Sequence, residues 1–265
     1  MSKGKVKDFL LATKDEAVSR IMESELVPEM IETFGEVIVS EGVAALIGDV
    51  IGASLPVING IRLSYKQNRF ERHVNYALQI MSDRIGVLEA NFNSLNSEVQ
   101  ESFKGKYLEW LMDNLYEEKQ TEKVPCHING YINLMSNEAN DNLLLMFFET
   151  INELTELDID VLRLHSSASQ GTIYELCERY KLSSGQVMVV KEKLARLGLL
   201  ESKNDELRDN NIDQVVEYLT KVAKDNKKKN PTGVSFPNTR IKKPNRYESY
   251  HITELGRGFL KVISN

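Results

Sequence analysis

The segment Val37–Leu63 constrains the fold most, because it is long, apolar and nearly free of charge. It reads VIVSEGVAALIGDVIGASLPVINGIRL, in which only Glu41, Asp49 and Arg62 carry a charge. A helix that is apolar on all of its sides must be buried, either inside a protein or in lipid. The segment therefore requires a substantial core, and a chain of 265 residues with 42% apolar residues is large enough to build one.

The length of the uninterrupted run indicates which of the two media surrounds it. About a dozen residues, Val43–Leu55, precede Pro56, whereas a membrane-spanning helix requires roughly 20. Gly48 and Gly52 form a G-x-x-x-G pair that permits close packing of helices. We expect a buried pair of helices interrupted at Pro56; the alternative is membrane insertion or self-association.

Most of the remaining N-terminal sequence has apolar residues at helical spacing. The expected helices cover Val6–Phe34 with a break near Pro28, Tyr65–Leu95, Phe103–Leu115 and Asn142–Leu157. The polar stretch Glu117–Gly130 contains Pro125 and is expected to be a loop. Residues 1–150 are therefore predicted to form an all-helical domain that serves oligomerisation or sensing.

A different pattern starts at Leu157 and continues towards the C-terminus. Three helices are expected in LDIDVLRLHSSAS, TIYELCERYKL and QVMVVKEKLARLG, with the tight turn Leu182–Gly185 between the last two. A hydroxyl in that turn is available to cap the third helix. Leu199–Glu201 is expected to start a first strand, and Tyr250–Leu260 to form a returning strand and a closing helix.

This order of elements resembles the MarR-like and related winged-helix families. In those families a helix-turn-helix ends in a Leu-Gly-Leu-Leu step, and the second wing strand continues into Ile/Leu-Thr-x-x-Gly. The corresponding residues here lie in Leu157–Leu200 and Tyr250–Ile263, in the right order and with helix-turn-helix spacing. The resemblance implies a mainly α fold in which residues 151–265 form a winged helix-turn-helix domain with a small β-wing. It also implies DNA binding as a dimer over paired half-sites.

A long insertion, Ser202–Ser249, separates the two expected wing strands. It contains a predicted helix, Ile212–Ala223, followed by KDNKKKNPTGVSFPNTRIKKPNRY. Residues Lys221–Arg246 hold nine Lys or Arg and one acidic residue, a local charge of +8 in a chain whose net charge is −6. A basic arm of this kind can follow DNA phosphates or enter a minor groove. Alternatively, it is a solvated surface loop.

The residues of the predicted recognition helix argue against simple base readout. Its core face carries Val187, Val190, Leu194 and Leu197, and its opposite face carries Met188, Val189, Glu192, Lys193 and Arg196. In the families that the domain resembles, small hydroxyls and an arginine usually flank the central core valine and suit base edges. Met188 and Val189 take those places here, and an exposed methionine and valine suit a protein interface better.

No catalytic cluster can be assembled from the sequence, and we expect neither an enzyme, a metal site nor a cofactor. The glycine-rich GDVIGASLP lacks the Gly-Lys-Ser/Thr of a P-loop. Cys126 and Cys177 form no disulfide framework, and without a recognisable signal peptide they favour a cytoplasmic location. The histidines are scattered over four segments and form no metal-binding pattern: His73, His127, His165 and His251.

The first functional hypothesis is a DNA-binding transcriptional regulator of bacterial or mobile-element origin. Polar and basic side chains of the recognition helix then face the major groove: Ser184, Gln186, Lys191, Lys193 and Arg196. Basic side chains of the insertion hold the DNA backbone: Lys227, Lys228, Lys229, Arg240, Lys242, Lys243 and Arg246.

The second hypothesis is an interaction protein whose winged helix binds protein. Its apolar segment Gly42–Ile61 then acts on a membrane or on a partner. An apolar Gly/Pro segment that leads into an Arg-rich helix, here within Val43–Ile85, loosely resembles small host-defence proteins carried on phage and mobile elements. That resemblance implies a role in phage defence.

Overall fold

The computed structural model describes residues 3–5, 38–60, 64–136, 138–166, 171–230, 232–235, 243 and 248–264. The chain divides into two compact units. Unit 1 comprises residues 1–156 together with 259–265, and unit 2 comprises residues 157–258. The described chain is mainly helical, as the sequence predicts, with two small antiparallel sheets of two strands each.

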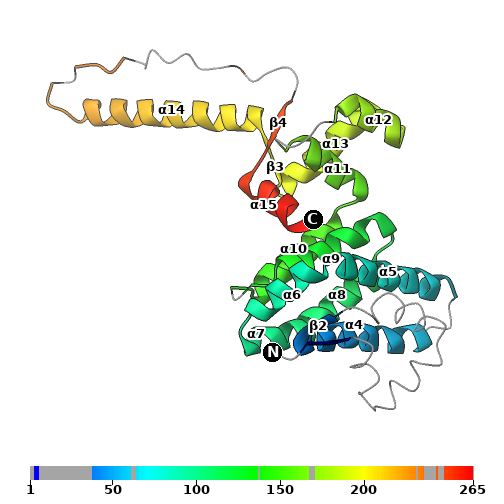
Figure 1. Ribbon diagram of the computed structural model, residues 1–265. Helices are drawn as coiled ribbons and strands as arrows, with labels where there is room; N and C mark the ends of the chain where they lie inside the picture. Colours follow the sequence, from blue (N-terminus) through cyan, green and yellow to red (C-terminus); the bar gives the residue numbers. More distant parts are fainter. Residues whose placement is uncertain are drawn as a thin grey trace. The chain divides into compact units, whose positions relative to one another are not determined.

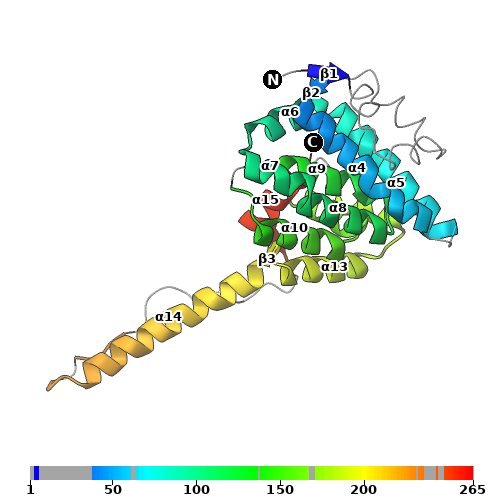
Figure 2. The ribbon, with the colours of Figure 1, turned by 90° about the horizontal axis from the view of Figure 1, so that it is seen from below.

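Unit 1 is a cluster of helices with a short sheet at one end (Figure 1, Figure 2). β1 (Lys3–Lys5) pairs antiparallel with β2 (Ile38–Ser40). The helices are α4 (Glu41–Gly60), α5 (Ser64–Asp83), α6 (Ile85–Ser94), α7 (Ser97–Lys104), α8 (Lys106–Glu117), the 3-10 turn η1 (Thr121–Lys123), α9 (Val124–Asn133) and α10 (Asp141–Glu153). α9 packs against α5, α6, α8 and α10 and is therefore the central helix of the unit.

Most of the apolar segment forms α4, and most of the apolar side chains of residues 43–54 are buried, as the sequence predicts. Val43, Leu46 and Val50 are fully buried, because α4 packs against α5, α6, α7 and α8. The backbone stays helical past Pro56, so the expected interruption there is wrong. A proline removes one intrahelical hydrogen bond and can be accommodated by a kink. Among the described residues, no helix combines the length and the apolar character that crossing a membrane requires.

The expected helix Tyr65–Leu95 is divided into α5 and α6, and the expected helix Phe103–Leu115 is interrupted near its start. Arg84 separates α5 from α6, and Gly105 separates α7 from α8. Arg84 leaves helical geometry, with φ −105° and ψ 18°. Its guanidinium donates to Asn129 Oδ1 at 2.6 Å and to Asn133 Oδ1 at 2.8 Å. These partners are 45 and 49 positions away in the chain, so helical spacing alone could not reveal this break.

Half of the polar stretch that we expect to be a loop, residues 124–130, belongs instead to α9. Pro125 lies in the first turn of this helix, where its missing N–H has no intrahelical partner to lose. The polar side chains of α9 are buried with partners, His127 on Glu118 and Asn129 on the Ile263 carbonyl. Polar composition indicated a loop, but hydrogen bonding inside the unit makes burial of these groups possible.

Unit 2 begins with helices and continues into a strand pair that is interrupted by a long helix (Figure 1). Its elements are α11 (Glu156–Leu164), α12 (Ile173–Tyr180), α13 (Ser184–Arg196), β3 (Leu200–Ser202), α14 (Lys203–Asn226), β4 (Tyr250–Ile252) and α15 (Glu254–Ile263), whose last residues belong to unit 1. β3 and β4 are antiparallel, with Leu200 opposite Ile252 and Ser202 opposite Tyr250.

The connection between α13 and the sheet depends on two glycines and one threonine. Gly198 has a φ of 71°, in the left-handed region that favours glycine. Thr253 Oγ1 donates to the Gly198 carbonyl at 2.7 Å and accepts from the Gly256 N–H at 3.0 Å. A Cβ on Gly256 would lie 2.2 Å from the Leu199 carbonyl oxygen. These contacts explain the Leu-Gly-Leu-Leu step and the Thr-x-x-Gly spacing in physical terms.

α14 extends the predicted helix Ile212–Ala223 at both ends. Ser202, the last residue of β3, caps its start by accepting from the Asp205 N–H at 3.1 Å. At the other end, buried Asp225 accepts from the N–H groups of Thr232 at 3.0 Å and Gly233 at 2.8 Å. The chain therefore passes from a three-residue strand directly into a helix of 24 residues.

Candidate nucleic-acid interface

α12 and α13 are joined by a short turn that local hydrogen bonds define. Thr172 caps α12 through a capping box with Glu175, and Ser183 caps α13 through a capping box with Gln186. Between them, Lys181 adopts a left-handed conformation with φ 52°. The hydroxyl cap that the sequence predicted is confirmed, whereas the turn is shorter than the predicted Leu182–Gly185, because α13 already begins at Ser184.

The exposed side of α13 carries part of the set predicted to face DNA. Ser184, Gln186 and Arg196 are exposed. Gln186 also accepts from the Ser183 N–H at 2.9 Å through Oε1, so its amide is held over the start of the helix. The first turn of α13 therefore presents polar side chains together with helix N–H groups that have no intrahelical partner.

Lys191 does not face outward, and this part of the predicted contact set is wrong. Its side chain is buried, because position 191 follows Val187 by four residues and precedes Leu194 by three, on the same helix face. Burial lowers the pKa of Lys191. The buried face is thus centred on Val187, Lys191 and Leu194, whereas Val190 and Leu197 are only partly buried.

Lys191 also influences a histidine of the same unit. Burial, and secondly the positive charge of Lys191, lower the pKa of His165 to about 4. His165 is therefore neutral at physiological pH and adds no charge to the surface of unit 2.

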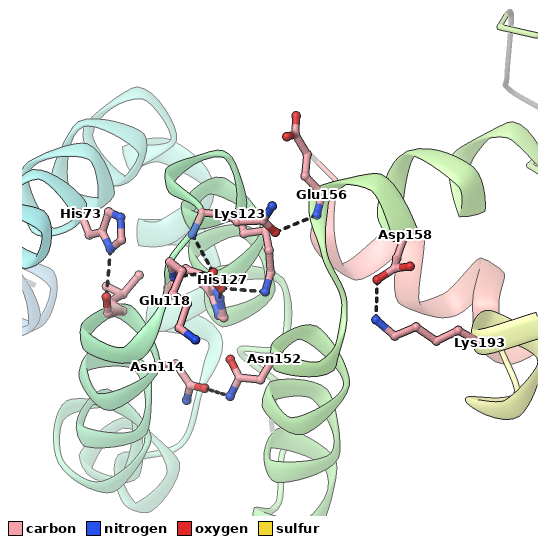
Figure 3. A network of polar contacts seen from close by, with 12 residues as sticks. His73, Asn114, Glu118, Lys123, His127, Asn152, Glu156, Asp158 and Lys193 are labelled. Carbon is pink, nitrogen blue, oxygen red and sulfur yellow. Dashed lines mark hydrogen bonds and ion pairs between the residues drawn. The ribbon is translucent and has the colours of Figure 1, made fainter. Parts of the chain in front are cut away.

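Lys193 forms an ion pair within unit 2. Its Nζ lies 2.5 Å from Asp158 Oδ2, and Figure 3 shows the lysine side chain directed at that carboxylate. Asp158 is buried, so this ion pair connects α11 with α13. To contact a phosphate, Lys193 would have to share or leave Asp158. The sequence pattern did not reveal this ion pair.

The basic end of α14 supplies the second part of the candidate interface. Lys227 and Lys229 are exposed, and Lys228 forms an ion pair of 2.8 Å with Asp225. The hydrogen bond from Lys228, together with bonds from Thr232 and Gly233, holds the pKa of the Asp225 carboxyl below its usual range. Lys243 is exposed as well. Three residues of the predicted set lie outside the described residues: Arg240, Lys242 and Arg246.

Unit 1 contains a buried polar cluster that sequence reasoning missed (Figure 3). Glu118 Oε2 lies 2.7 Å from Lys123 Nζ and 3.1 Å from His127 Nε2, and all three residues are buried. Glu118 Oε1 accepts from two backbone N–H groups, those of Lys119 at 2.8 Å and Gln120 at 2.9 Å. Burial raises the Glu118 pKa, but the hydrogen bonds from His127, Lys123 and Gln120 outweigh it and lower the pKa to about 2.

A cleft of about 440 Å³ lies beside this cluster, lined by residues 117–120, Lys123 and residues 152–155. Both carboxylate oxygens of Glu118 are already satisfied by protein donors, which gives the cluster a structural explanation. His127 is buried, and burial lowers its pKa. The cluster therefore holds α9 in place and presents no free acid or base to the cleft.

His73 and Cys126 are buried in unit 1, whereas Cys177 lies on α12 and His251 on β4, with His251 Nε2 at 3.1 Å from Glu201 Oε2. Within the part of the chain that the structure describes, no group of three or more His, Cys, Asp and Glu residues is placed to hold a metal ion. Comparisons with known protein families, with curated proteins and with solved structures find no match for this chain.

Proposed function

We propose that unit 2 and α15 form a winged helix-turn-helix domain that binds DNA, as in a transcriptional regulator. The observation that carries this proposal is the order and the capping of its elements. α12, a tight turn and the capped helix α13 are followed by an antiparallel strand pair and a closing helix. This is the order of the helix-turn-helix and wing in the families that the sequence resembles.

In this proposal α13 enters the major groove with its first turn towards the DNA. Ser184 donates to a phosphate oxygen, or donates to or accepts from a base edge, and the N-terminus of the helix favours a phosphate. Arg196 contacts the backbone near the other end of the helix. Lys227, Lys229 and Lys243 add a sequence-independent attraction, which the net charge of −6 makes necessary.

The test is binding of the full chain to random-sequence duplex DNA, measured by fluorescence anisotropy over a salt series. A Kd of about 1–100 µM that rises with salt is expected for non-specific binding. Changing Lys227, Lys229 and Lys243 to Gln should lower the salt slope by about 1 for each lost phosphate contact.

The matched control changes three exposed basic residues of unit 1, Lys66, Arg72 and Lys119, to Gln. This control removes the same charge and should keep the binding of the unaltered chain. Absence of binding at low salt overturns the proposal, and so does an equal loss in both variants, because that result reflects net charge alone.

A second candidate function is an interaction or host-defence protein, and apolar exposure favours it. Tyr174 on α12 and Val189 on α13 are 70% and 61% exposed, which fits protein contact better than base contact. Val189→Asp should then abolish capture of a partner by the full chain, and any protection of cells against phage. If DNA is the ligand of α13 instead, the same variant should weaken DNA binding, because it places a negative charge on the helix that faces the phosphates.

A further inference from the structure

The helix inserted between β3 and β4 has an apolar stripe on its exposed side. Ile212, Val216 and Leu219 are 58%, 54% and 56% exposed, and Ala223 continues the same line. Their spacing of four, three and four residues places them on one face of α14. Figure 1 and Figure 2 both show α14 extending from the strand pair, and among the described elements it packs chiefly against β3 at its start.

The charges of α14 are separated along its length of about 36 Å. The first part carries Asp205, Glu206, Asp209, Asp213 and Glu217, with Arg208 and Lys203 as its cations. The last part and the turn after it carry Lys221, Lys224, Lys227, Lys228 and Lys229, with Asp225 as the one acid within residues 221–230. The acidic first part therefore complements the basic last part of another such helix, and it repels another acidic first part.

The charged side chains also lie on one side of the stripe. Four charged residues are separated by intervals of 4, 11 and 3 residues, a helical spacing that places them along one flank of the helix: Asp209, Asp213, Lys224 and Lys227. In an antiparallel pair of identical helices, related by a two-fold axis, equivalent flanks face each other. Asp209 and Asp213 of one copy then lie near Lys224 and Lys227 of the other. The stripe pairs in the same register, with Ile212 opposite Ala223 and Val216 opposite Leu219.

We propose that the apolar stripe of α14 binds α14 of a second copy of this chain, in antiparallel orientation. The proposal does not require DNA binding, because it concerns the exposed stripe of α14 and uses no nucleic acid. The charge pattern selects a second copy as the occupant, and it selects the antiparallel over the parallel arrangement. The stripe is short, so the dimer is expected to be weak and to dissociate on dilution.

The first test is sedimentation velocity of the full chain without DNA between about 1 and 100 µM, the range in which a small interface dissociates. The sedimentation coefficient should rise from that of a monomer towards that of a dimer. Ile212→Ser with Leu219→Ser should raise the dissociation constant by at least about tenfold. The matched control, Val87→Ser with Met146→Ser, removes exposed apolar side chains of unit 1 and should leave self-association unchanged.

The charge argument is tested by reversing each half of the flank separately. Asp209→Lys with Asp213→Lys makes the flank basic throughout, and Lys224→Glu with Lys227→Glu makes it acidic throughout. Each variant alone should remain monomeric, and an equimolar mixture of the two should form a heterodimer. Lys227 also belongs to the proposed DNA contact, so the serine variants, which keep every lysine, separate failure of this proposal from failure of DNA binding.

Orientation is tested by disulfide formation in a Cys177→Ser background, in which the remaining Cys126 is buried. A mixture of the Asp209→Cys and Lys227→Cys variants should form a cross-linked heterodimer, and Asp209→Cys alone should not cross-link to itself. Cross-linking of Asp209→Cys with itself overturns the antiparallel arrangement. A chain that stays monomeric at about 100 µM overturns the proposal.

Discussion

Glu118 and Lys123 form an ion pair of 2.7 Å inside unit 1, with only 6% and 4% of their side chains exposed. The same Glu118 oxygen lies 3.1 Å from His127, at the centre of α9. Two opposite charges are thus enclosed together, and each depends on the other for compensation. The cluster determines how the segment after α8 turns into α9.

Removing one partner of this ion pair should lower the free energy of unfolding strongly, whereas removing both partners should change it little. Glu118→Gln leaves the Lys123 charge buried without its counter-ion and should lower the free energy of unfolding by about 3–5 kcal/mol. Adding Lys123→Met should restore most of that loss, because no uncompensated charge remains. Urea unfolding of both variants measures the difference. Equal stability of the single and the double variant contradicts this account.

The pH dependence of stability should report the same carboxylate. The Glu118 pKa is about 2 in the folded chain and 4.5 in its ordinary state. The ionised Glu118 carboxylate therefore contributes its full stabilisation of the fold above pH 4.5. This stabilisation is lost as the pH falls from 4.5 towards 2. This loss amounts to about 3 kcal/mol.

The Glu118→Gln variant is the control for this pH dependence, since it lacks the titrating group. Its stability should still decline between pH 6.5 and about 4. His165 has its pKa lowered from 6.5 to about 4, so protonating it opposes folding over that range. A variant that loses as much stability below pH 4.5 as the unaltered chain argues against Glu118 as the source.

Gly130 should not tolerate a methyl group, although glycine is usually a poor helix residue. A Cβ there would lie 2.0 Å from Phe147 Cζ, within the buried contact of α9 and α10. Gly130→Ala should therefore lower the free energy of unfolding by about 1–3 kcal/mol. Phe147→Leu in the same chain should recover part of this loss.

Gly52 in α4 is the matched control, because nothing outside its own turn of helix lies within 4 Å of the position that its Cβ would take. Gly52→Ala should raise stability by about 0.5–1 kcal/mol, the usual gain for a helix interior. Thermal unfolding compares both variants. If Gly52→Ala lowers the stability and Gly130→Ala does not, these results contradict the packing that we describe.

The C-terminal residues should stabilise unit 1 through the asparagines of α9. Asn129 donates to the Ile263 carbonyl at 3.1 Å, and Asn133 donates to the Val262 carbonyl at 2.8 Å. Both asparagines also accept from Arg84. Asn129→Ala with Asn133→Ala removes both acceptors and should lower stability by about 2–4 kcal/mol. Asn142→Ala, at an exposed position of α10, is the control and should change little.

The sequence predicted the features that rest on local patterns. The mainly helical class, the burial of α4 and the Ser183 cap of α13 follow from spacing within a few residues. The separation of acidic and basic residues along α14 is also visible in the printed sequence. It becomes a property of one helix only because α14 extends from Lys203 to Asn226.

Features that depend on distant partners could not be predicted in this way. Arg84 ends a helix through asparagines more than 40 positions away, and Lys193 meets Asp158 across 35 residues. Pro125 indicated a loop, yet it lies in the first turn of the central helix. Lys191 was expected to face DNA, but the phase of α13 places it on the buried face with Val187 and Leu194.

The central claim is that the first turn of α13 faces DNA, and site-directed cross-linking tests it most directly. A photoreactive benzophenone on Ser184→Cys, in a Cys177→Ser background, should cross-link to a labelled duplex at low salt. The same probe on Val87→Cys, at an exposed position of unit 1, should give little or no product. Equal yields at both positions, or no product at Ser184→Cys while the duplex is bound, would contradict the claim.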